Sequence, residues 1–150
     1  MKANDYWQNF VTTHDVENAT FSAYAFGSND KYADELSNLV EQGKKTATSS
    51  VYDIYLLEEE PLPKIGAYNV ILDSQSNAVC VTKTTAVTVV PFKEVSARHA
   101  YLEGEGDRSL KYWMMVHAPF FAEEYANYLE PLKQFTPDSL CVCEEFKVIK

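Results

Sequence analysis

The chain has 150 residues, of which 46% are hydrophobic and 23% charged, and its formal net charge at pH 7 is -9. This length fits one domain with its own core, and the apolar content excludes a disordered chain. Proteins that grip a DNA duplex or long RNA through phosphates usually present a basic face, so the acidic balance favours a small polar ligand or a short RNA segment.

Four elements are predicted in the first 60 residues. In chain order they are a helix over 5–11, a strand over 20–27, a helix that ends near residue 43, and a helix over 51–58. Asn29 or Asp30 can cap the start of the third element, and Gly43 lies where it would terminate. The fourth follows Ser50, which with Asp53 resembles a capping box, and a strand is the alternative there.

The rest of the chain is predicted to contain most of the strands. In chain order we expect a strand over 66–73, a turn over 74–77, a strand over 78–90 with a break near 84–85, a helix over 95–102, a loop over 103–107, a helix from 110 to about 128, and a strand over 140–149. Asp107 or Ser109 caps the long helix, which Pro119 kinks or restarts. The expected fold is α+β: a small mixed, partly closed β-barrel with flanking helices.

Compartment signals are few. Residues 1–5 are not followed by the apolar stretch of a signal peptide, and no run approaches the roughly 18 apolar residues of a membrane helix. Cys80, Cys141 and Cys143 are an odd number without framework spacing, which fits a reducing compartment. We therefore expect a cytoplasmic protein with no membrane partner. Cys141 and Cys143 would share one buried strand face, which explains them better than metal binding.

The segment from Gly43 to Ser50 is the first candidate site, because six of its eight residues carry a hydroxyl or an ammonium group. If a helix begins near Ser50, its unpaired amides would point back at this segment and bind an anion or an oxyanion. Lys45 and Thr48 would share a face on a helical turn but diverge on a strand. A solvated helix-capping loop is the alternative interpretation.

A second candidate lies over residues 103–107, where three acidic residues and two glycines form a predicted loop. A carboxylate there could accept a proton or contact the amino group of a base, and the alternative is a capping loop with ordinary surface acids. His99 and His117 lack a metal-pair spacing, and His117 is expected to be a packed, hydrogen-bonded histidine. Trp113 is expected in the core.

Residues 43–50, with the sequence GKKTATSS, resemble the G-x-K-x-x-T-x-R signature of the ASCH domain, a relative of the PUA RNA-binding fold. The resemblance covers nearly the whole chain and continues through residues 25–27, 62–66, 79–81, 90–92, 103–110, 112–113 and 143–146. It implies a barrel with a cleft at its mouth and a nucleoside or short single-stranded RNA as partner. We expect a monomer or weak dimer. Ser50 replaces the final Arg of the signature, which removes a planar charged group suited to phosphate or base contacts.

The resemblance also implies site residues. Some ASCH proteins look like amidohydrolases that remove the acetyl group from N4-acetylcytidine with a Lys, a Thr three residues later and a Glu. The motif places the lysine at Lys45 and the threonine at Thr48. Aligning residues 99–100 with a similar pair in those amidohydrolases places the glutamate at Glu103, and Glu105 is the alternative. The implied ligand-binding residues are Phe26, Gly43, Thr46, Ser49, Ser50, Glu105, Asp107 and Arg108. No metal ligand is assigned and no cofactor is expected.

Three activities are compatible with these residues. In an amidohydrolase, Thr48 would attack the amide carbonyl, Lys45 would take the hydroxyl proton, and Glu103 would position Lys45 or the cytosine amine and help protonate the leaving amine. The second activity is non-catalytic binding of RNA or a nucleotide. The third is metal-dependent RNA cleavage, with a divalent ion held by Glu103, Glu105 and Asp107. Hydrolysis of a small substrate ranks first because it suits the acidic surface.

Overall fold

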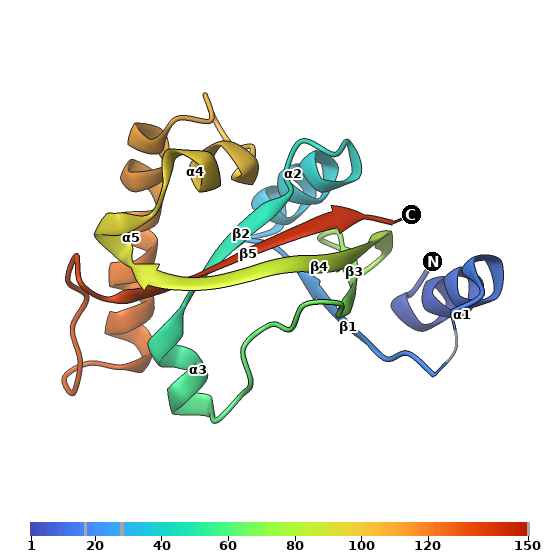
Figure 1. The fold of residues 1–150 in the computed structure, drawn as a ribbon, viewed down its shortest axis with the longest axis horizontal. Coiled ribbons are helices and arrows are strands. Elements are labelled where there is room, and N and C mark those ends of the chain that lie inside the picture. The colour runs from blue at the N-terminus through green and yellow to red at the C-terminus, as the bar shows by residue number, and fades with distance from the viewer. Residues whose placement is uncertain (17, 28, 150) are drawn as a thin grey trace. The chain divides into compact units, whose positions relative to one another are not determined.

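The computed structural model describes residues 1–16, 18–27 and 29–149. Its elements in chain order are α1 (Ala3–His14), β1 (Phe21–Ala25), α2 (Asp30–Glu41), β2 (Ala47–Val51), α3 (Tyr52–Glu58), β3 (Tyr68–Leu72), β4 (Ala78–Pro91), the 3-10 helix η1 (Phe92–Glu94), α4 (Ala97–Glu103), α5 (Leu110–Tyr128) and β5 (Leu140–Val148) (Figure 1). The strand order in the sheet is β1-β3-β4-β5-β2. The mixed α+β class expected from the sequence is confirmed.

The chain forms two compact units. Unit 1 comprises Met1–Thr46, Lys64–Ala86 and Phe146–Lys150, and unit 2 comprises Ala47–Pro63 and Val87–Glu145. In unit 1, β1 pairs with β3 in parallel and β3 pairs with β4 in antiparallel fashion. In unit 2, β2 pairs with β5 in antiparallel fashion. Among the helices of the described residues, none is both long and apolar enough to cross a bilayer.

In unit 1, neighbouring residues of β3 are buried in two different apolar clusters. Val70 packs in a cluster with Trp7 and Phe10 of α1, whereas Ile71 packs in a cluster with Val40 of α2. Because successive strand residues point to opposite faces, α1 and α2 cover opposite faces of β3. The core of this unit therefore has two layers.

The end of α2 fixes where Lys45 leaves the helix. Gly43 has a φ of 76°, a left-handed conformation that glycine adopts without cost. Its amide donates to the Val40 carbonyl at 2.9 Å, and the Lys44 amide donates to the Leu39 carbonyl at 2.9 Å. This pair of bonds is the Schellman arrangement, and it confirms that Gly43 terminates the helix. The amide of Lys45 also donates to Leu39, at 3.0 Å.

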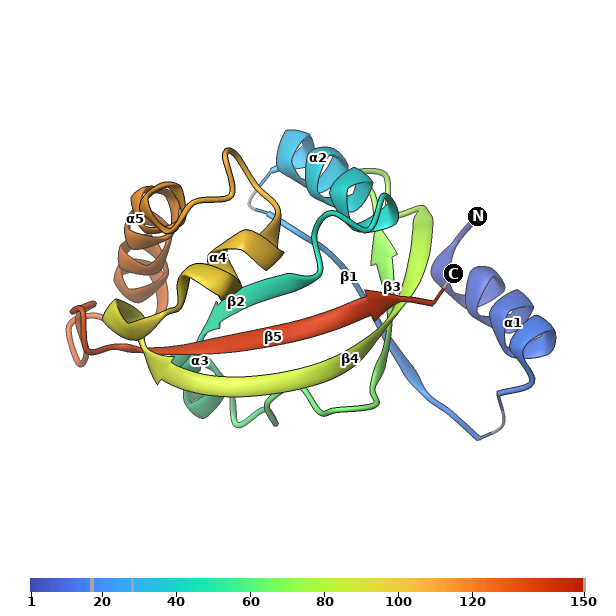
Figure 2. The same cartoon turned by 45° about the horizontal axis from the view of Figure 1, so that its top comes forward.

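In unit 2, one apolar core joins β2 and β5 to α4 and α5. Figure 2 shows α4 lying alongside β2. Cys141 and Cys143 are buried there with their sulfurs 3.8 Å apart, which confirms that they share one face of a strand. The buried members of this core are Val51, Phe92, Val95, Ala100, Trp113, Phe121, Tyr125, Leu129, Cys141 and Cys143.

The capping box expected at Ser50 is wrong, although the helix that should follow it is present. Residues 47–51 form a strand, Val51 is the N-cap of α3, and no side chain caps that helix. The carboxylate of Asp53 instead accepts a hydrogen bond from the Tyr125 hydroxyl at 2.7 Å. Pairing with β5 places Ser50 in the sheet, so the helix begins two residues later, at Tyr52, without a side-chain cap.

Three further expectations need correction. Strand β4 runs through residues 84–85 without a break, because the Thr84 amide and carbonyl bond to Ala67 and Gly66 at 2.9 and 2.8 Å. Helix α5 runs through Pro119 without restarting. Proline has no N–H to donate to the carbonyl of Met115, four residues earlier, and because Met115 is exposed, water can bond to that carbonyl instead. Glu103 is the last residue of α4 rather than part of a loop. Of the alternative caps expected from the sequence, Asn29 is the N-cap of α2 and Ser109 is the N-cap of α5.

Candidate functional site

The buried carboxylate of Glu103 is the centre of a polar cluster in unit 2. Glu103 is 2% exposed, and its Oε2 accepts hydrogen bonds from the Ser49 hydroxyl and from Trp113 Nε1, both at 2.6 Å. The Nε2 atoms of His99 and His117 lie 3.2 and 3.6 Å from the same oxygen. A buried carboxylate is costly unless donors and positive charge surround it. We call these five residues the Glu103 cluster.

Three elements bring the cluster together. His99 and Glu103 are four residues apart on α4, and Trp113 and His117 are four apart on α5, so each pair shares a helix face. Ser49 comes from the middle of β2. The rings of Trp113 and His117 stack 4.2 Å apart with 10° between their planes. The cluster is therefore held by both helices and by the strand.

The cluster does not form a serine-histidine-acid relay. In such a relay the hydroxyl and the acid use different ring nitrogens of the histidine. Here the Ser49 hydroxyl lies 2.7 Å from His99 Nε2, and the Glu103 carboxylate lies against that same nitrogen at 3.2 Å. The arrangement instead fixes the position of the carboxylate.

His99 and Cys143 perturb each other in the same buried region. Burial alone lowers the pKa of His99, but hydrogen bonds and charge interactions with Cys143 and Glu103 outweigh it and raise the pKa to about 9. The hydrogen bond from Cys141 is the main reason that the pKa of Cys143 falls to about 5, and the neighbouring His99 adds to this against the effect of burial. The pair therefore resembles an imidazolium beside a thiolate.

We expect the imidazole of His99 to remain protonated at pH 7, because its raised pKa keeps the charged form until the pH approaches 9. A histidine NMR titration measures the midpoint directly. Cys143→Ala should move the midpoint down toward the ordinary value of about 6.5. Cys80→Ala, which removes a buried thiol of unit 1, is the matched control and should leave it unchanged. A wild-type midpoint below pH 7 contradicts the assignment.

The loop after α4 has a tightly defined backbone. At Gly106, φ is 59° and a Cβ would clash with the Tyr112 ring, so any other residue would strain the backbone and displace that ring. Arg108 also has a positive φ, of 65°. Its Nε donates to the Tyr101 carbonyl at 2.9 Å, and its guanidinium lies 3.7 Å from the centre of the Tyr101 ring. The loop thus presents a cation stacked on an exposed aromatic ring.

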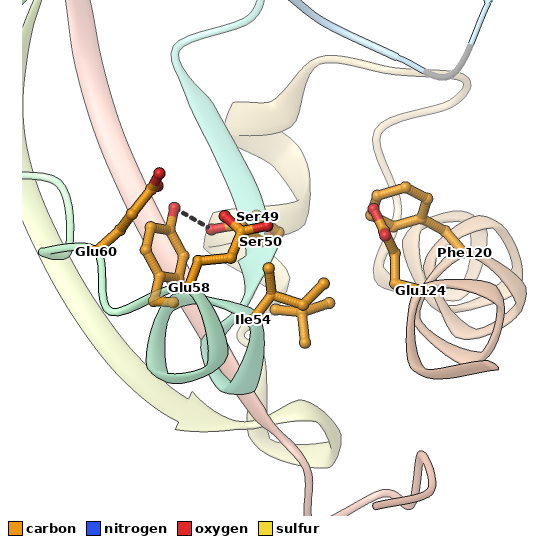
Figure 3. A pocket seen from close by; sticks show the side chains of 9 residues that line it. Ser49, Ser50, Ile54, Glu58, Glu60, Phe120 and Glu124 are labelled. Carbon is orange, nitrogen blue, oxygen red and sulfur yellow. Dashed lines mark hydrogen bonds between the residues drawn. The ribbon is translucent and has the colours of Figure 1, made fainter. Parts of the chain in front are cut away.

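A cavity of about 260 Å³ adjoins the cluster and shares Ser49 with it. Figure 3 shows Phe120 and Glu124 on one side and the β2 and α3 residues on the other. The Ser50 and Tyr55 hydroxyls are hydrogen-bonded at 2.9 Å in its wall. Among the described residues that line it, none is basic. These residues are Ser49, Ser50, Val51, Ile54, Tyr55, Glu58, Glu60, Phe120 and Glu124.

Burial and nearby acidic residues raise the pKa of two groups that line the cavity, Glu124 and Tyr55. Burial is the main cause for Glu124, and the charges of Glu123 and Glu58 add to it. Burial also dominates for Tyr55, whose pKa is raised further by Glu144 and Glu60 and lowered by the hydrogen bond with Ser50. The cavity therefore has an excess of negative charge that a phosphate would oppose.

The site residues expected from the sequence are divided between the units. Lys45 is 1% exposed, and its ammonium group lies 5.3 Å from the centre of the Phe26 ring, at a distance suited to a cation–π contact. The carbonyl of Thr46 accepts from the Phe146 amide at 3.0 Å. Unit 1 contains Phe26, Gly43, Lys45 and Thr46, and unit 2 contains Thr48, Ser49, Ser50, Glu103, Glu105, Asp107 and Arg108.

Within unit 2, Ser49 rather than Thr48 is the hydroxyl residue that contacts Glu103. Successive residues of a strand point to opposite faces, so Thr48 leaves β2 on the other face. No hydrogen bond joins Thr48 to Glu103 in the described part of this unit. Thr48 is half-buried and lies opposite Glu144 in the strand pairing.

Of the loop acids, Glu105 is half-buried and lies in one group with Glu103 and His117. Asp107 is exposed, and its carboxylate accepts from the Ser109 amide at 2.9 Å. Glu103 and Glu105 therefore lie together, whereas Asp107 is not a member of that group.

Sequence reasoning missed three members of the Glu103 cluster. The sequence assigns no role to His99 and predicts that Trp113 and His117 are packed residues. His117 is indeed packed and hydrogen-bonded, its Nδ1 lying 2.9 Å from the Trp113 carbonyl. The available signal was the spacing of four residues in both helical pairs. That spacing predicts a shared face but not that the faces of α4 and α5 meet.

Comparison with known proteins places this chain in a family. A crystal structure of a protein from Enterococcus faecalis V583 is 41% identical, with 97% of this chain and 86% of that chain covered and a TM-score of 0.88. The ASCH domain from Lactobacillus crispatus JV V101 is 29% identical, with 97% and 92% covered and a TM-score of 0.89. No curated protein matches significantly. The family model for the ASCH domain matches residues 22–150, and the chain therefore belongs to the ASCH domain family.

Proposed function

We propose that this protein is an amidohydrolase that removes an acyl group from the exocyclic amine of a nucleoside, with N4-acetylcytidine as the substrate type. The observation that carries the proposal is the buried, oriented carboxylate of Glu103, which Ser49 and Trp113 hold by one oxygen at 2.6 Å. A carboxylate fixed in a desolvated site can orient an amine or return a proton to it as it leaves.

The cavity beside the cluster supports an uncharged substrate. Glu58, Glu60 and Glu124 line it, and they would repel the phosphate of a nucleotide or of RNA. Ile54 and Phe120 supply apolar surface against which a flat base can pack. The volume of about 260 Å³ lies just below the roughly 300 Å³ at which ordinary small-molecule sites begin, so only a small substrate would fit. A free nucleoside therefore suits the cavity better than a strand of RNA.

The chemistry follows the roles that the family motif assigns. The Thr48 oxygen would bond to the acyl carbon while Lys45 takes its proton. The carbon–nitrogen bond would then break and the amine would leave with a proton, after which water would release the acyl group as a carboxylate. Among the two adjacent hydroxyls, that of Ser49 is committed to Glu103 and His99. The motif assigns the nucleophile to Thr48, which leaves β2 on the face opposite Ser49, so the substrate would have to reach both faces of this edge strand.

The test is to incubate the purified protein with N4-acetylcytidine and to follow cytidine and acetate by chromatography. We expect equal amounts of both products, and slower conversion of the 5′-monophosphate because of the acidic cavity. A protein that is shown to be folded but yields neither product contradicts the proposal.

Non-catalytic RNA binding is a second candidate, favoured by the pair of Arg108 and Tyr101. Tyr101 is 54% exposed beneath the guanidinium, and such a pair can stack on a base. This candidate predicts binding of a short single-stranded RNA that weakens steeply with salt and falls in Tyr101→Ala. Tyr32→Ala, which removes an exposed tyrosine of unit 1, is the control and should bind the RNA as the parent does. Binding that is equal in both variants, or independent of salt, rejects it.

A further inference from the structure

Three side chains able to ligate a metal ion meet where α4 ends and α5 passes. Glu103, Glu105 and His117 each contribute one ligand atom to a group whose atoms lie within 4.8 Å of one another. Gly104 lies between the two acids in a left-handed conformation, with a φ of 77°. This turn allows both carboxylates to approach the same point.

The orientation of His117 directs its second ring nitrogen at the Glu103 carboxylate. Its Nδ1 lies 2.9 Å from the Trp113 carbonyl, and because a carbonyl can only accept, Nδ1 must carry the hydrogen. The Nε2 atom then faces the Glu103 carboxylate at 3.6 Å, on a residue that is only 9% exposed. Either a proton on Nε2 or a cation held between the two atoms would make this contact favourable.

The spacing favours a metal ion over a shared proton. An N–H···O bond would bring Nε2 to about 2.9 Å from the oxygen, whereas the observed separation is 3.6 Å. Ligands bonded to a transition metal at about 2.1 Å lie roughly 3 to 4 Å apart. The ligand atoms of Glu103, Glu105 and His117, which lie within 4.8 Å of one another, would therefore have to approach one another by at most about 1 to 2 Å around an ion.

The surroundings already orient two of the ligands. A metal-bound histidine usually donates its other ring N–H to a carbonyl or carboxylate, and the Trp113 carbonyl has that role for His117. The Glu103 carboxylate is held by Ser49 and by the Trp113 indole. Such outer contacts fix ligand direction before an ion arrives.

We propose that Glu103, Glu105 and His117 form a binding site for a divalent transition-metal ion such as Mn²⁺, Co²⁺ or Zn²⁺. One imidazole nitrogen with two carboxylates suits these ions better than Mg²⁺ or Ca²⁺, which prefer oxygen ligands alone. The set differs from the three acids that the sequence suggested, because His117 replaces Asp107. The site does not depend on the proposed amidohydrolase activity, since ion binding is measured without a substrate.

Trp113 provides a built-in reporter, because its ring stacks on His117 at 4.2 Å. The sequence has two tryptophans, so Trp7→Phe leaves Trp113 as the sole source of tryptophan emission. In that background we expect Co²⁺ or Mn²⁺ to quench the emission in a saturable manner and Zn²⁺ to displace the quencher. Equilibrium dialysis with elemental analysis should find about one ion per chain.

Two variants locate the ion. Glu105→Gln should weaken Co²⁺ binding at least tenfold, and because this residue is only half-buried, the fold should survive. Asp107→Asn, two residues later and outside the group, is the matched control and should bind as the parent does. Absence of quenching in the parent, or equal loss in the two variants, overturns the proposal. Turnover of N4-acetylcytidine in excess chelator is read separately, so that failure of the metal site and failure of the amidohydrolase remain distinguishable.

Discussion

We expect the Lys45→Met protein to be folded and to show no measurable turnover of N4-acetylcytidine. A hydroxyl is a weak nucleophile unless an adjacent base takes its proton, and Lys45 is the base in the proposed chemistry. Methionine keeps an unbranched apolar stem of similar length, so contact with Phe26 is retained while the ammonium group is removed. Initial rates by chromatography, with thermal unfolding of the same sample, measure both parts of the prediction.

Lys44→Met is the matched control for this experiment. Lys44 is the preceding residue and is exposed, whereas Lys45 is 1% exposed. The same chemical change at position 44 should leave turnover at the wild-type rate. If Lys45→Met retains turnover within tenfold of the wild type, Lys45 is not the base. If both variants lose turnover equally, the loss comes from the lower net positive charge of the segment and not from a specific role of Lys45.

The parts of the fold that were predicted correctly depend on local signals. The left-handed Gly43 ends α2 because the amides that follow it bond back within the same helix. Cys141 and Cys143 share a face because alternation along a strand is a property of neighbouring residues. Both features need only a few consecutive residues, which the sequence displays directly.

The parts that could not be predicted depend on segments distant in the sequence. Ser50 and Asp53 satisfy a local capping pattern, but pairing of β2 with β5 places Ser50 in a strand and leaves Asp53 to bond with Tyr125. Local preference and tertiary pairing compete there, and pairing prevails because it satisfies the backbone of the whole strand.

The Glu103 cluster shows the same limit at the level of the site. The spacing of His99 and Glu103, and of Trp113 and His117, predicts two helix faces. The sequence of either helix alone does not predict that the two faces meet beside Ser49. The family motif directed attention to Thr48, whereas contact with the acid comes from its neighbour on the opposite face of β2. The motif identifies the segment 43–50, but only the structure shows that the Ser49 hydroxyl contacts Glu103.

Glu103→Gln is expected to lower turnover of N4-acetylcytidine by about 10²- to 10⁴-fold, the range associated with loss of a positioned acid or base. Glutamine has the same shape, and its carbonyl oxygen can still accept from Ser49 and Trp113. The loss should appear equally in kcat and in kcat/KM, because the interaction forms in the transition state. Steady-state rates across substrate concentrations separate these constants.

The control for Glu103→Gln is Glu94→Gln, an exposed acid that lies before α4 in the same unit. It should retain wild-type constants. A rise in KM with unchanged kcat in Glu103→Gln would assign Glu103 to substrate binding instead of proton transfer. Unchanged constants would mean that the cluster only stabilises the buried charge of Glu103. Glu105, the alternative acid from the family resemblance, would then be the next residue to test.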